Sequence, residues 1–211
     1  MKRAILFVAV ASAAAGVVVV GLDRSGGNDN ADGTTYRVSG ALASQSGGGS
    51  TPTPLTAIER LERAIKLKSG TKKAVGEFEL STGQKVRLHT ADIEDGQSCL
   101  IDEVPDAAAG ASCLENGLFA LRKVEFFVNS EGNPDQLEQL YVGGVVAPSI
   151  RSISVRKTDG STAQLRLTRE RAFLYESSAA ELRGGVLPSE LRLFGASGKL
   201  VEVLRIPPLE E

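Results

Sequence analysis

Aromatic residues, histidine and cysteine are scarce in this chain of 211 residues. It has no tryptophan, only 5% aromatic residues, one histidine and two cysteines. Few aromatic side chains mean few stacking platforms, which argues against sugar binding and single-strand binding. The formal net charge of -2 leaves no basic field that would recruit nucleic acid or an acidic membrane surface. We therefore expect no nucleic-acid partner.

Motifs that carry known chemistry are missing as well. The sequence contains no P-loop and no GxGxxG motif. His89 is the only imidazole, and it falls on the polar side of a predicted strand beside Arg87, which favours a solvated surface side chain. Two cysteines and one distant histidine do not make the tight ligand set of a zinc site. Residues 195–198, around Ser197, lack the spacing of a nucleophile elbow and predict a hairpin loop. We expect no catalytic, metal-binding or cofactor-binding residues.

The N-terminal residues 1–24 have the pattern of an export signal. Lys2 and Arg3 precede an uncharged apolar run at 4–22. Small residues at 13–15 would suit cleavage, yet the run continues beyond them and comes close to the thickness of a bilayer core. We favour an uncleaved anchor that places the rest of the chain outside the cell membrane. If the segment is cleaved, the protein is secreted. No cysteine follows the run, which excludes a lipoprotein anchor.

The next two segments differ sharply in composition. Residues 25–54 are rich in Gly, Ser, Asn and Pro and predict a disordered linker, in which Tyr36 and Val38 could form a short strand. Residues 55–70 predict an amphipathic helix over 55–68, because apolar residues recur at three- and four-residue spacing after a capping box that begins at Thr56. Packing of this helix on the following domain is favoured over binding of a partner.

From residue 71 to residue 206 the sequence predicts a β-rich extracytoplasmic domain, either single or divided into two sub-modules at about 71–130 and 131–206. Apolar residues alternate with polar ones in three predicted hairpins. The clearest hairpin joins 153–155 to 163–167 through Asp159-Gly160, with Ile153 and Leu165 on its buried side. The run at 117–128 is apolar on both sides, which suits a central strand. The predicted fold is mainly β, an antiparallel β-sandwich or barrel-like domain with one N-terminal helix.

The two cysteines are expected to form a disulfide. Export places Cys99 and Cys113 in an oxidising compartment, where a single pair is normally joined. Two free buried thiols and a redox-active pair are the alternatives. The spacing is far from Cys-x-x-Cys, and no basic cluster is visible that would lower a thiol pKa, so the redox-active pair is the weaker of the two.

Carboxylates cluster around the first cysteine. They could bind a divalent cation or serve as an acid/base pair, although a solvated acidic loop is favoured. These residues are Asp92, Glu94, Asp95, Asp102 and Glu103.

Two segments carry a resemblance to other proteins. One is Cys-Leu-Ile at 99–101 followed by Gly-Ala-Ser-Cys at 110–113. The other is Tyr-Val-Gly-Gly-Val-Val-Ala-Pro at 141–148 followed by the hairpin and a late strand pair around 197–199. The pattern resembles a loose set of uncharacterised bacterial extracytoplasmic proteins with an export signal, a Cys-pair module and a C-terminal β-rich module. The resemblance implies a location and an architecture, and no activity.

Together these observations predict a non-enzymatic protein that binds or forms part of the cell envelope. Its partner would be an envelope protein or polymer, with the membrane contacted through residues 1–24. The alternative is an extracytoplasmic hydrolase that uses the carboxylates between Asp92 and Glu103.

Overall fold

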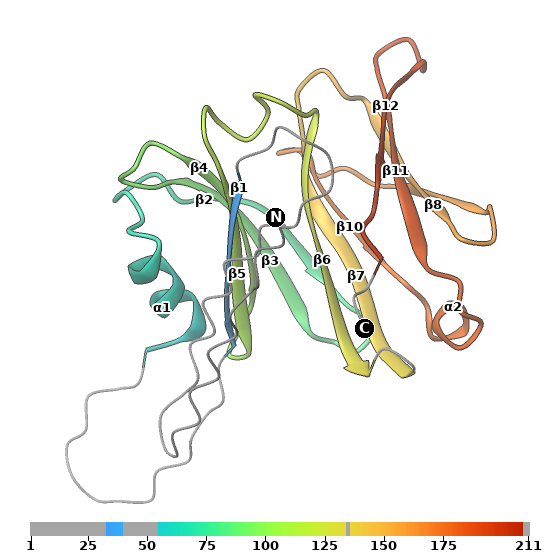
Figure 1. The fold of residues 1–211 in the computed structure, drawn as a ribbon, viewed down its shortest axis with the longest axis horizontal. Coiled ribbons are helices and arrows are strands. Elements are labelled where there is room, and N and C mark those ends of the chain that lie inside the picture. Colours follow the sequence, from blue (N-terminus) through green and yellow to red (C-terminus); the bar gives the residue numbers. More distant parts are fainter. Residues whose placement is uncertain (1–32, 40–54, 134–135, 209–211) are drawn as a thin grey trace, which may run out of the picture.

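The computed structural model describes residues 33–39, 55–133 and 136–208 (Figure 1). Among these residues the protein is mainly β, with antiparallel strand pairs and two short helices, which confirms the predicted fold class. No helix in the described part of the chain is long and apolar enough to cross a membrane. The predicted anchor at 1–24 lies outside the described residues.

A helix and three sheets are stacked in four layers (Figure 1). The helix is α1 (Ala57–Ala64). The first sheet has the order β1-β5-β4-β3-β2 and consists of β1 (Gly33–Ser39), β2 (Lys73–Glu79), β3 (Lys85–Asp92), β4 (Ser98–Val104) and β5 (Ala108–Leu114). The middle sheet has the order β10-β7-β6 and consists of β6 (Val124–Asn133), β7 (Gln136–Val146) and β10 (Ala172–Glu176). The outer sheet has the order β12-β11-β8-β9 and consists of β8 (Ser152–Lys157), β9 (Thr162–Leu165), β11 (Pro188–Phe194) and β12 (Leu200–Arg205).

The three predicted hairpins are present. They are β2–β3, β8–β9 and β11–β12, and all pair antiparallel. Gly160 turns the β8–β9 hairpin with a φ of 83°, a left-handed conformation that favours glycine. Ile153 is fully buried opposite Leu165. Leu165 lies on the same side, as predicted, and packs against the same core, but it is only partly buried because β9 is an edge strand of the outer sheet.

Helix α1 packs against the first sheet. Thr56 and Glu59 form the predicted capping box, with each side chain bonded to the other residue's backbone N–H. The helix ends at Ala64, earlier than predicted, because Lys66 has a positive φ and Leu67 bridges to Ile93. The apolar stripe of the helix, with Leu61 at its centre, is buried on the same side of the sheet as the two cysteines.

The predicted disulfide is confirmed. Cys99 on β4 and Cys113 on β5 are directly opposite each other in the register, with their Cα atoms 4.0 Å apart. Both side chains are completely buried under α1.

Strand β1 lies within the predicted linker at 25–54. Residues 33–39 pair with β5 along its whole length, in the region where Tyr36 and Val38 suggested a short strand. The remainder of the linker lies outside the described residues. The first sheet is therefore completed by a segment that precedes the helix in sequence.

The central strand of the middle sheet is β7, and the prediction of a central strand at 117–128 is wrong. Residues 117–123 are irregular, and β6, which starts at Val124, is an edge strand of the middle sheet. Strand β7 is buried without interruption from Gln139 to Val146, because the first sheet covers one of its faces and the outer sheet covers the other. Gly143 and Gly144 interrupt its apolar sequence, so the residue pattern did not predict a central strand here.

Replacing Gly144 with alanine should destabilise the protein, because a Cβ atom there would lie 2.3 Å from the Glu125 carbonyl oxygen and 2.9 Å from the Phe126 Cα. Both atoms belong to the backbone of β6, so the strands would have to separate. We expect a loss of about 1–3 kcal/mol, measured by urea unfolding. Gly143→Ala is the matched control, because its Cβ would meet the end of the Phe127 ring, which can rotate away. A larger loss for Gly143→Ala would contradict this account.

Helix α2 (Ala179–Arg183) connects the middle sheet to the outer sheet and is tied to the β8–β9 hairpin. Ser178 and Glu181 form a second capping box. Lys157, at the end of β8, donates to Glu181 at 2.5 Å. This hydrogen bond, opposed by partial burial, holds the pKa of Glu181 at about 2.

Candidate functional site

The carboxylates that suggested a hydrolase do not converge. Asp92 accepts from Ser98 at the end of β3, and Glu94 and Asp95 are exposed in the turn that follows. Asp102 and Glu103 are successive residues of β4, so their side chains lie on opposite faces of the first sheet.

Because Asp102 and Glu103 lie on opposite faces, they have different partners. Asp102 accepts from Asn129 of the middle sheet at 2.9 Å, whereas Glu103 lies on the α1 side. This placement does not support the acid/base pair that was the less favoured interpretation of these carboxylates. Among the described residues no group of three or more His, Cys, Asp or Glu side chains could hold a metal ion.

His89 is not the solvated surface side chain that was predicted. Its Nε2 lies 3.2 Å from Oε2 of Glu103, and both side chains are only 12% exposed. The polar side of β3 faces the helix layer rather than open water, which a strand pattern alone does not reveal. Burial lowers the pKa of His89, nearby Lys72 lowers it further, and the hydrogen bond to Glu103 opposes both effects.

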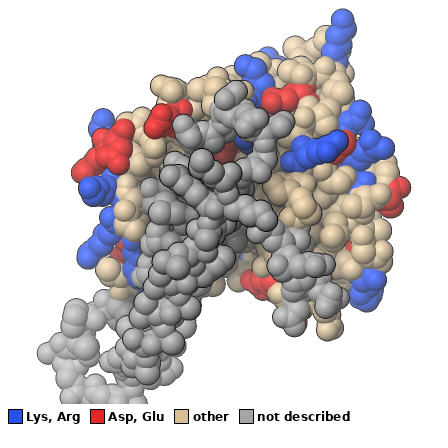
Figure 2. All heavy atoms as spheres, viewed as in Figure 1, with Lys and Arg blue, Asp and Glu red and all other residues tan. Residues whose placement is uncertain are grey.

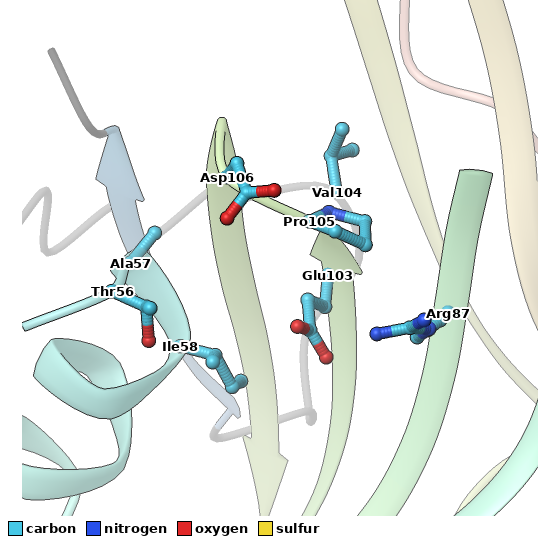
Figure 3. A pocket seen from close by; sticks show the side chains of 8 residues that line it. All are labelled: Thr56, Ala57, Ile58, Arg87, Glu103, Val104, Pro105 and Asp106. Atoms are coloured by element: carbon cyan, nitrogen blue, oxygen red, sulfur yellow. The ribbon is translucent and has the colours of Figure 1, made fainter. Parts of the chain in front are cut away.

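A pocket of about 270 Å³ lies beside this pair, between the start of α1 and strands β3 and β4 (Figure 3). Glu103 lies in its centre, Asp106 at its rim, and Arg87 points toward Glu103 from the opposite wall. Arg87 Nε also donates to Glu77 at 3.0 Å, which lowers the pKa of Glu77.

The hydroxyl that lines this pocket belongs to Thr56, and it is engaged in the capping box. The pocket thus combines opposite charges without an unengaged hydroxyl among its lining residues. It could accommodate a small polar group. Ser197 lies in the turn between β11 and β12, as predicted, and not at a nucleophile elbow.

Glu125 is a buried acid that the sequence did not suggest. It is 6% exposed, on β6 between the first and middle sheets, and accepts from Ser112 at 2.7 Å. Burial raises its pKa, while the hydrogen bond from Ser112 and nearby Arg122 partly offset the rise. Because it is enclosed between two sheets, Glu125 serves packing rather than a site that is open to ligands.

The outer face of the outer sheet carries other side chains than its inner face. Its inner face packs on the middle sheet through Ile153, Val155, Leu191 and Leu193, so alternate residues of the same strands point outward. The outward residues of β8 and β9 are those that sequence alternation placed on the polar side.

The strand register arranges these outward residues in rows. One row runs Arg205, Glu190, Arg156 and Thr162 across β12, β11, β8 and β9. The next row runs Val203, Arg192, Ser154 and Gln164. Arg166 is exposed just after β9.

This face has four arginines and one glutamate. The ion pair from Arg156 to Glu190 on this face is long, at 3.8 Å. Figure 2 shows lysine and arginine side chains along the edge of the molecule where this sheet lies. Arg192, Arg205 and Glu190 were not predicted as site residues, although the alternation of the β11–β12 hairpin could have placed them on the outward side.

Two surfaces therefore stand out in the described part of the chain. One is a small pocket beside α1 that is lined by one arginine and two carboxylates, and the other is a basic sheet face at the other end of the stack. No protein-family model matches this chain, and comparisons with curated proteins and with solved structures found no match.

Proposed function

We propose that this chain is a non-enzymatic extracytoplasmic protein that binds a polymer of the cell envelope through the outer face of its outer sheet. Residues 1–24 would hold it at the cell membrane, or release it if they are cleaved. The observation that carries the proposal is that this face gathers four arginines and one glutamate and is not packed against another sheet among the described residues. The middle sheet is covered on both sides, and the first sheet is covered by the middle sheet and in part by α1.

A polymer fits this face better than a folded protein partner. Phe194 is the one aromatic residue on the outward side of β8, β9, β11 and β12, whereas tryptophan and tyrosine are enriched among the residues that dominate binding at protein interfaces. Repeated arginines on a flat sheet suit a chain with repeated groups. The dispersed carboxylates and the engaged Thr56 hydroxyl favour binding over the hydrolase alternative.

The proposed location is supported by two features. The basic start and apolar run at 1–24 have the pattern of an export signal. The buried Cys99–Cys113 bridge is of the kind that persists in oxidising compartments outside the cytoplasm.

Co-sedimentation tests the function. The full chain, in neutral detergent, is mixed with insoluble envelope polymer from which proteins have been removed by protease. We expect the chain to sediment with the polymer, and the double variant Arg156→Glu with Arg192→Glu to remain in the supernatant, because it reverses two charges on the face. The control Arg63→Glu changes an exposed charge on α1, at the other end of the stack, and should still sediment. Equal behaviour of the two variants, or no sedimentation of the unaltered chain, would refute the proposal.

A further inference from the structure

Three arginines of the outer face are near enough to one another to contact the same anion. Arg156 and Arg205 flank Glu190 on the two neighbouring strands, and Arg192 follows Glu190 by two residues on β11. Directly opposed side chains on paired strands are about 5 Å apart at Cβ, and diagonal neighbours about 7–8 Å. Arg192 is thus a diagonal neighbour of both other arginines. We call Arg156, Arg192 and Arg205 the arginine triangle.

Glu190 does not neutralise the arginine triangle. One carboxylate faces three guanidinium groups, and its contact with Arg156 is 3.8 Å, beyond hydrogen-bond distance. The Arg156 side chain is 48% exposed. The triangle therefore retains positive charge and donor groups directed to solvent.

The shape of the donor set favours phosphate. A guanidinium group binds oxyanions through two parallel N–H groups. A carboxylate offers two oxygens, whereas a phosphate group in a diester or monoester offers a tetrahedral set that several guanidinium groups can approach from different sides. Three neighbouring arginines match the second geometry better.

A second cationic point lies outside the arginine triangle. Arg166 is two strands across from Arg192 and one row along, which corresponds to about 12 Å. A chain of linked phosphates can occupy the triangle and contact Arg166 at the same time.

We propose that the arginine triangle binds phosphate groups of a linear phosphodiester polymer, and that Arg166 contacts a further phosphate along the same chain. This inference rests on the proposed function, because it names the chemistry of the polymer bound at that face. It predicts that Glu190, which lies between two of the arginines, competes with the ligand.

The test measures binding of a fluorescently labelled synthetic poly(glycerol phosphate) to the full chain in neutral detergent, by anisotropy over a series of salt concentrations. Arg192→Gln and Arg156→Gln should each weaken binding about tenfold, because each removes a charge-assisted hydrogen bond. Both should also flatten the salt dependence. Glu190→Gln should strengthen binding, and the control Arg63→Gln should leave it unchanged. These side chains are at least partly exposed, so thermal unfolding should show that all variants are folded.

Several outcomes would overturn the inference. One is an equal loss of polymer affinity in Arg63→Gln and Arg192→Gln, and another is weaker polymer binding by Glu190→Gln. A third is binding of poly-glutamate with the same affinity as the phosphate polymer. The last is competition by inorganic phosphate that is as strong, per phosphate group, as competition by unlabelled polymer. Binding to phosphatidylglycerol vesicles without binding to the polymer would assign the face to a membrane instead. If the polymer fails to bind while envelope sedimentation still depends on Arg156 and Arg192, this inference falls and the proposed function stands.

Discussion

Replacing Ile153 with alanine should cost about 2–5 kcal/mol of unfolding free energy. Ile153 is completely buried on β8, in the core between the outer and middle sheets. Truncation would leave a cavity between two sheets that are fixed by their own hydrogen bonds, so the site cannot collapse easily. Urea unfolding followed by circular dichroism measures the change.

Leu165→Ala is the matched control for this experiment. Leu165 is opposite Ile153 in the register but is only partly buried on an edge strand, so its truncation should cost clearly less. If the two variants lose the same stability, β9 would have to be packed as tightly as β8, and the assigned layer order would be wrong.

Removing the disulfide should lower stability by about 3 kcal/mol, because the bridge closes a loop with a sequence separation of 14 and so restricts the unfolded chain. The suitable variant is Cys99→Ala combined with Cys113→Ala. Both sulfurs are completely buried in an apolar core, and alanine introduces no unsatisfied polar group there. Urea unfolding of the oxidised protein and of the double variant gives the difference.

Two controls accompany the disulfide experiment. Thiol titration of the unfolded, unreduced protein should find no free thiol among the two cysteines. Polymer binding should persist in the folded double variant, because the bridge and the arginine triangle lie in different layers. An unchanged unfolding midpoint would show that the bridge does not stabilise the fold.

Local patterns were sufficient to predict the hairpins, and the structure shows why. Alternation around Ile153 and Leu165, with Asp159-Gly160 between them, depends only on neighbouring residues. Layer order depends on contacts between distant residues. The apolar run at 117–128 therefore looked like a central strand, whereas the central strand β7 was concealed by Gly143 and Gly144.

The candidate binding face could not be predicted from the sequence for the same reason. Arg156, Arg166, Arg192 and Arg205 are far apart in the chain, and the net charge of -2 suggested no basic surface. Only the register of the outer sheet brings them together.

The burial of His89 was not predicted, because alternation shows which side of a strand is polar, but not that this side faces α1.

The pairing of β1 with β5 limits how far the domain can stand from the membrane. With the anchor that we propose at 1–24, only residues 25–32 separate the bilayer from the first sheet. Eight residues can span at most about 28 Å. The outer sheet lies two sheet spacings beyond the first, or about 20 Å. The distance of the arginine triangle from the lipid surface would then have an upper limit, and a polymer bound there could not be held farther out.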